Sequence, residues 1–128
     1  MHVDYPKKID LKKNLPQYPF KAAKILFAVD KWDGPTAGLC LLKGREYWFD
    51  LLEESYPRRK RRRVFALIRL SKDQIAEERL WHRLFGLLVN NGKKVRPQEW
   101  WPRFYGPYEA RPKITVKPED IVGKLVHV

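Results

Sequence analysis

Short apolar runs bounded by turn residues dominate the first half of the chain. Such runs are typical of buried strands, and they predict strands at residues 24–30, 37–42, 45–53 and 63–70. Lys43-Gly44 has the composition of a tight turn, so the second and third of these strands are expected to form a hairpin. The fourth is largely apolar at both odd and even positions, which predicts a place near the centre of the sheet with cover on both faces.

The hydrophobic repeat changes after Leu70. From Lys72 to about Asn90 the apolar residues recur at intervals of three and four, which predicts an amphipathic helix. Ser71 followed by Gln74 is a capping box that marks where this helix begins. We expect its apolar arc to pack against the sheet. The arc comprises Ala76, Leu80, Trp81, Leu84, Phe85, Leu87, Leu88 and Val89.

The remaining segments are less regular. Residues 1–21 are proline-rich and predict an extended N-terminal arm, and residues 93–112 combine prolines with aromatic side chains, which predicts a long irregular aromatic loop. Residues 113–117 and 121–128 are predicted to be two closing strands. The predicted fold class is α+β: an antiparallel sheet of four to six strands packed by one long helix, in a single domain over residues 22–128.

Composition narrows the class of protein. The chain has 128 residues, of which 44% are hydrophobic and 13% aromatic, too many for a disordered protein. Cys40 is the only cysteine, which excludes an internal disulfide. No apolar run is long enough for a transmembrane helix, so we expect a cytoplasmic protein that does not contact membranes. Because the sequence has no glycine-rich phosphate loop, nucleophile elbow or paired-cysteine motif, no cofactor is expected.

A run of six cations at residues 58–63 holds half of the formal charge of +12. It lies between two predicted strands, so we expect a solvated hairpin loop that contacts nucleic-acid phosphates; six such contacts would give a salt slope of about −5 on duplex DNA. Lys93, Lys94 and Arg96 would assist if they share a side. A turn that only aids solubility and a nuclear-localisation signal are the alternatives. The run comprises Arg58, Arg59, Lys60, Arg61, Arg62 and Arg63.

Two further groups are candidates for contacts or chemistry. Trp100, Trp101, Phe104 and Tyr105 would stack on unpaired bases or fill a partner's pocket if exposed, and would cover the sheet if buried.

Glu77 falls within the apolar arc of the helix, either near its start, where the helix dipole favours a carboxylate, or partly buried beside Arg45 or Arg69. Glu78 and His82 are four residues apart, the spacing of two metal ligands on one helix side or of an ordinary surface pair.

These features favour a small basic binding protein that contacts nucleic acid through residues 58–63. The alternative is a protein-interaction module, antitoxin-like or immunity-type, that binds an acidic partner protein. A small enzyme using Glu77, Glu78 or His82 is a third class. The sequence does not fix the oligomeric state.

The order of several motifs resembles a loose group of small uncharacterised bacterial proteins. Those proteins share a D-G-P-x-x-G strand entry, a glycine turn, an aromatic strand and a helix that carries a tryptophan. The corresponding positions span roughly residues 30–85, and the resemblance implies a bacterial cytosolic protein without indicating an activity. The motifs here are Asp33-Gly34-Pro35 with Gly38, Gly44, Tyr47-Trp48-Phe49, and Leu70-Ser71 leading to Glu78 and Trp81.

Overall fold

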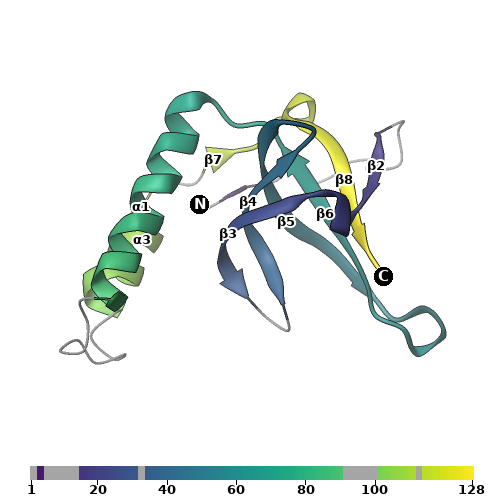
Figure 1. The fold of residues 1–128 in the computed structure, drawn as a ribbon, viewed down its shortest axis with the longest axis horizontal. Coiled ribbons are helices and arrows are strands. Elements are labelled where there is room, and N and C mark those ends of the chain that lie inside the picture. The colour runs from purple at the N-terminus through teal and green to yellow at the C-terminus, as the bar shows by residue number, and fades with distance from the viewer. Residues whose placement is uncertain (1–2, 5–14, 32–33, 91–100, 112–113) are drawn as a thin grey trace. The chain divides into compact units, whose positions relative to one another are not determined.

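The computed structural model describes residues 3–4, 15–31, 34–90, 101–111 and 114–128 (Figure 1). The chain divides into two compact units, each described here by itself. The helical unit comprises Met1–Tyr5 and Ser71–Thr115, and the sheet unit comprises Pro6–Leu70 and Val116–Val128. In sequence, Ser71–Thr115 of the helical unit are therefore inserted within the sheet unit, and Met1–Tyr5 precede it. A six-stranded sheet and one long helix confirm the α+β class. The predicted single domain at 22–128 stays a prediction.

The sheet has the strand order β2-β8-β6-β5-β4-β3. All neighbouring strands are antiparallel except β2 and β8, which are parallel. The five predicted strands that correspond to β3, β4, β5, β6 and β8 are confirmed, and the positive φ angles of Lys43 (50°) and Gly44 (77°) fit a type I′ hairpin turn. The strands are β2 (Gln17–Pro19), β3 (Lys24–Lys31), β4 (Pro35–Leu42), β5 (Arg45–Ser55), β6 (Arg62–Ile68) and β8 (Ile121–His127).

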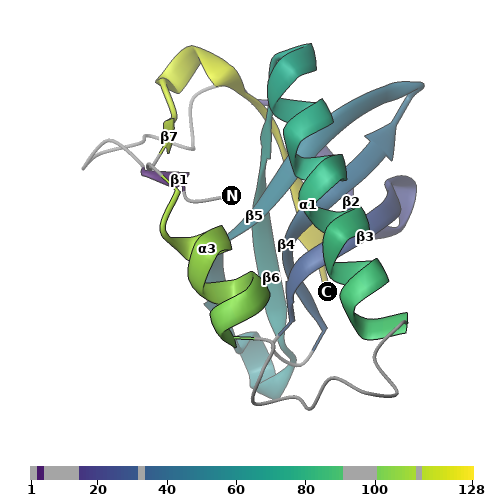
Figure 2. The ribbon, with the colours of Figure 1, turned by 90° about the vertical axis from the view of Figure 1, so that its left-hand side faces the viewer.

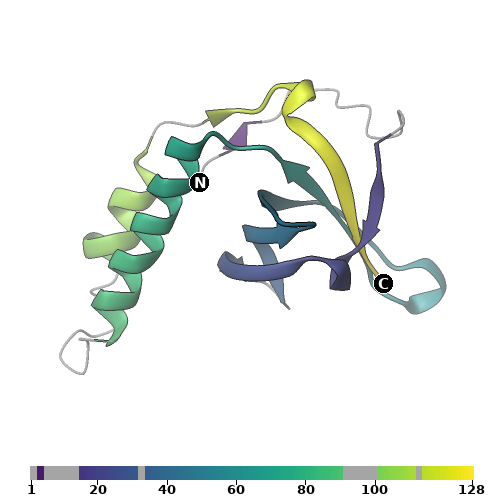
Figure 3. The same cartoon turned by 45° about the horizontal axis from the view of Figure 1, so that its top comes forward.

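A short connection forces this sheet to curl. β2 and β3 lie at opposite edges, yet only a 3₁₀ turn at Phe20–Ala22 and Ala23 separate them in sequence. The five residue steps from Pro19 to Lys24 reach at most about 18 Å, whereas the outer strands of a flat six-stranded sheet lie about 24 Å apart. Figure 3 shows the strands curling round. Register shifts in the β3–β4, β5–β6 and β6–β8 pairs accommodate the bend.

The concave side of the curl holds the hydrophobic core. β6 lies between β5 and β8, and every residue from Arg63 to Ile68 is buried, as expected for a central strand covered on both faces. Phe20 closes the core from the 3₁₀ turn, with its ring 5.0 Å from that of Phe65 and stacked 4.9 Å from that of His127. The core cluster comprises Ala23, Cys40, Leu42, Phe49, Phe65, Leu67 and Leu125.

The second described part of the predicted arm, residues 15–21, belongs to the sheet unit. Gln17–Pro19 pair with Lys124–Val126, and Lys124 donates its backbone N–H to the carbonyl of Pro16. Pro19 is tolerated because β2 is an edge strand. Residues 5–14 lie outside the described residues.

The helical unit contains α1 (Lys72–Asn90), a π-helical turn at Trp101–Tyr105, α3 (Gly106–Glu109), and the parallel pair β1 (Val3–Asp4) and β7 (Ile114–Thr115). The predicted helix is confirmed at both ends. Its capping box is formed: the Ser71 N–H donates to Gln74 Oε1 at 2.9 Å, and the Gln74 N–H donates to Ser71 Oγ at 3.1 Å. The prediction of an irregular segment is wrong over residues 101–109, which are helical. Figure 2 shows α1 and α3 side by side.

Gly38 lies where β3 and β4 approach each other closely, and its substitution tests this contact. A Cβ at this position would lie 2.1 Å from the carbonyl oxygen of Phe27 and 2.8 Å from the Cα of Ala28, and backbone atoms cannot rotate away. Gly38→Ala is expected to lower the free energy of unfolding by about 3 kcal/mol, measured by denaturant titration. Gly86→Ala is the control, since nothing lies within 4 Å of its Cβ, and alanine should stabilise the helix by up to about 1 kcal/mol. Equal effects of the two substitutions would contradict the prediction.

Candidate nucleic-acid interface

The predicted basic loop is the tip of the β5–β6 hairpin, residues 56–61. Figures 1 and 3 both show this tip projecting beyond the other strands of the sheet unit. Its backbone reverses through two overlapping turns, in which the Arg59 N–H donates to the Tyr56 carbonyl (3.3 Å) and the Lys60 N–H donates to the Pro57 carbonyl (3.0 Å). Arg58 and Arg59 have φ of 52° and 66°, as the central residues of the second turn require. This conformation costs a non-glycine residue about 1–2 kcal/mol.

Three of the six cations are displayed on the tip. Arg58, Arg59 and Lys60 are exposed, and within the described part of the chain none of them forms an ion pair. Arg61 and Arg62 are half-buried. A Cβ on Gly34, which directly precedes β4, would lie 4.0 Å from Arg61 Nη2. The guanidinium of Arg61 therefore lies near the β3–β4 connection. The displayed charge is concentrated at residues 58–60.

Arg63 corrects the expectation that the whole run faces solvent. Alternation along β6 places it on the face of Phe65 and Leu67, and its side chain is only 2% exposed. Its Nε donates to Glu54 Oε2 at 2.7 Å. The register shift between Leu51 and Glu53 brings Glu54 opposite Arg63. Arg63 is thus part of the interior at the base of the hairpin, because burying a guanidinium requires a paired carboxylate.

Tyr56 is a surface residue that the sequence analysis did not single out. It is 63% exposed, and its hydroxyl donates to Glu54 Oε1 at 2.5 Å. This bond and the nearby Arg63 guanidinium hold the pKa of Glu54 below its ordinary value, and the same bond raises the pKa of Tyr56. Glu54 therefore links a buried cation to an exposed ring. The signal in the sequence was an aromatic residue directly before Pro57 and the basic run.

The other predicted contact residues belong to a later part of the chain. Lys93, Lys94, Arg96 and Trp100 lie outside the described residues, and Trp101 and Tyr105 belong to the π-helical turn. Phe104 is buried, so it does not present an open face for a base. Its ring lies 4.5 Å from that of Phe85, 5.4 Å from that of Tyr108 and 5.9 Å from that of Trp81. These three rings all belong to the helical unit, so the contacts bury Phe104 within that unit and do not test whether the aromatic residues cover the sheet.

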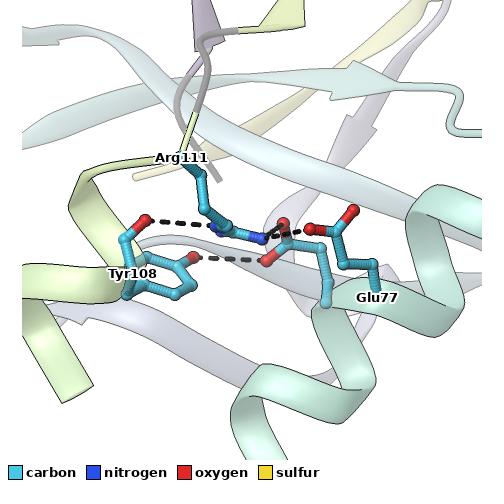
Figure 4. A network of polar contacts seen from close by, with 4 residues as sticks. Glu77, Tyr108 and Arg111 are labelled. Atoms are coloured by element: carbon cyan, nitrogen blue, oxygen red, sulfur yellow. Dashed lines mark hydrogen bonds and ion pairs between the residues drawn. The ribbon is translucent and has the colours of Figure 1, made fainter. Parts of the chain in front are cut away.

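A polar network in the helical unit involves two of the proposed enzyme residues (Figure 4). Glu78 is only 2% exposed, forms an ion pair with Arg111 Nη1 at 3.0 Å and accepts a hydrogen bond from the Tyr108 hydroxyl at 3.2 Å. This burial overturns the interpretation of Glu78 as a surface residue. Glu77 is half-exposed and also contacts Arg111 Nη1, at 3.3 Å, so its arginine partner is neither Arg45 nor Arg69. Sequence spacing gave no signal for Arg111.

Arg111 also contacts two aromatic rings. Its Cζ lies 4.1 Å from the ring centroid of Tyr108 and 5.1 Å from that of Trp81. The Nη2 atom of Arg111 is buried and has no hydrogen-bond acceptor among the described residues. Burial and the neighbouring Glu78 carboxylate raise the pKa of Tyr108, and partial burial lowers the pKa of His82. This network holds α3 against α1.

Within the described residues, no three His, Cys, Asp or Glu side chains gather as metal ligands. No helix in that part of the chain is long and apolar enough to cross a membrane. No family model matches the sequence, and no curated protein or solved structure matches it.

The Glu54–Arg63 pair predicts a pH dependence. Because the pKa of Glu54 is lower in the folded protein than its ordinary 4.5, the unfolded chain takes up the proton first as the pH falls. The stabilisation that the Glu54 carboxylate gains from the Tyr56 hydroxyl and from Arg63 is complete well above pH 4.5 and disappears as the pH falls through the folded value. Glu54→Gln should therefore have a lower melting temperature than the unmodified protein at pH 7 and a smaller deficit at pH 3. Glu53→Gln, at an exposed neighbour, should change little at either pH; a constant difference for Glu54→Gln would contradict the prediction.

Arg111→Met tests the buried network. The substitution keeps an unbranched side chain but leaves the Glu78 carboxylate buried without this cation, so we expect a loss of about 3 kcal/mol in the free energy of unfolding. The control is Arg103→Met, which removes an exposed cation and should change stability by less than about 0.5 kcal/mol. Denaturant titration at pH 7 measures both. Equal stability of the two variants would refute a structural role for the pair.

Proposed function

We propose that this protein binds nucleic acid through the hairpin tip, with Arg58, Arg59 and Lys60 contacting phosphates. The observation that carries the proposal is the exposure of these three cations at consecutive positions on a projecting tip. Cations without a local carboxylate partner raise the local concentration of polyanions and speed their association. Arginine suits this role because its planar guanidinium donates two parallel hydrogen bonds to one phosphate.

Two features support nucleic acid over an acidic protein as the ligand. The charged surface is a narrow turn, which fits a regularly spaced phosphate backbone better than it fits a broad protein interface. An exposed aromatic ring also lies two residues before the first of these cations, a combination common in proteins that bind nucleic acid. Binding would be weak and independent of sequence, with dissociation constants of roughly 10⁻⁴–10⁻⁶ M at physiological salt.

The test compares two variants of equal charge. One carries Arg58→Ser, Arg59→Ser and Lys60→Ser; the control carries Lys21→Ser, Lys24→Ser and Lys43→Ser, three exposed cations elsewhere in the sheet unit. Fluorescence anisotropy with a labelled single-stranded oligonucleotide at 50 and 200 mM salt gives affinity and salt slope. We expect the tip variant to lose most of its affinity and to reduce the magnitude of the slope by about 2, because each phosphate contact contributes about 0.7.

The control variant should keep the slope and most of the affinity. Equal losses in both variants would show that net charge alone drives binding, which contradicts the proposal. The absence of any binding at low salt would also contradict it. If a defined acidic protein bound the tip and oligonucleotides did not, the ligand would be a protein. Unchanged melting temperatures confirm that both variants fold.

A further inference from the structure

We infer that Tyr56 stacks on an unpaired base, so that the hairpin tip selects single-stranded over double-stranded nucleic acid. This inference rests on the proposed function and adds a residue and a class of substrate to it. Tyr56 is the most exposed aromatic side chain in the described structure, and three exposed cations follow it within four residues. A ring beside groups that bind phosphates lies close to the sugars and bases that those phosphates link.

The orientation of the Tyr56 ring is restrained on its polar side. The hydroxyl donates to Glu54, the same carboxylate that accepts from the buried Arg63, and Glu54 and Arg63 lie opposite each other in the β5–β6 ladder. The ring is therefore tethered to the sheet by the Tyr56–Glu54 hydrogen bond and, through Glu54, by the Glu54–Arg63 hydrogen bond, while most of its surface stays in solvent. A tethered ring loses less conformational entropy on stacking than a freely rotating one.

The chemistry of stacking favours an unpaired base. Bases in a duplex are already stacked on their neighbours, and a ring at its surface reaches only base edges and the sugar–phosphate backbone. Bases of a single strand can turn outward and place a whole face on an aromatic side chain, regardless of their identity. Pro57 follows Tyr56 and fixes the backbone where the chain turns toward the cations. Base and phosphate contacts thus come from one short stretch of the tip.

The experiment separates base contacts from phosphate contacts. The probes are a labelled 20-nucleotide thymidine strand, an abasic strand of equal length and charge, and a 20-base-pair duplex, each titrated in low salt against the full chain. Tyr56→Leu removes the aromatic face, whereas Tyr56→Phe keeps it and removes the tether to Glu54.

For the unmodified protein we expect tighter binding to the thymidine strand than to the abasic strand or the duplex. Tyr56→Leu should lose about tenfold to hundredfold in affinity for the thymidine strand and keep its affinity for the abasic strand. The affinity of Tyr56→Phe for the thymidine strand should lie between those of the unmodified protein and Tyr56→Leu. Retained abasic binding also shows that Tyr56→Leu is folded.

The two proposals fail in different ways. If neither strand nor the duplex binds, the proposed function is wrong and this inference falls with it. If all three probes bind equally and Tyr56→Leu changes nothing, phosphate binding stands and base stacking is refuted. Equal losses of affinity for the thymidine and abasic strands would also refute stacking, because an abasic strand has no base for Tyr56 to stack on.

Discussion

The structure of the sheet unit depends on one constraint of chain length. The short link between β2 and β3 is too short to join the edges of a flat sheet, so the sheet must curl, and its concave side becomes a core. Phe20 lies within that link and enters the core directly. The register shifts that allow the curl also set which side chains meet across the strands. One of these shifts places a glutamate opposite an arginine at the base of the hairpin.

That pairing divides the basic run into parts with different roles. Arg63 is an interior residue whose charge is matched by Glu54, while residues 58–60 remain on the surface. Glu54 also holds the exposed ring of Tyr56. The Glu54–Arg63 ion pair lies where the hairpin joins the sheet, whereas the exposed cations lie at its far end. The helical unit has a similar arrangement around Glu78, where two aromatic rings and an arginine enclose a carboxylate.

Much of this fold was predictable, because its signals are local. Turn composition at Lys43-Gly44, apolar runs and the Ser71–Gln74 capping box each identify an element without knowledge of its neighbours. The features that could not be predicted depend on contacts between residues far apart in the sequence. β2 is three residues long and finds its partner at residues 124–126, and Arg111 meets Glu78 from a separate helix end. For Arg63, the charge of the run pointed to solvent, and the register shift that brings Glu54 opposite it has no local signal in the sequence.

The insertion of the helical unit between β6 and β8 affects how the chain assembles. During synthesis β6 emerges long before β8, so the edge that β8 later covers carries unpaired backbone groups while residues 71–115 are added. β2 also cannot pair until β8 has been synthesised, since β8 is the strand it pairs with. Arg69 then donates its backbone N–H to the carbonyl of Asp120, which joins the chain segments on either side of the inserted residues. A nascent chain stalled within the inserted segment would therefore expose an aggregation-prone, half-built sheet, which makes this stretch the one where a ribosome-associated chaperone would matter most.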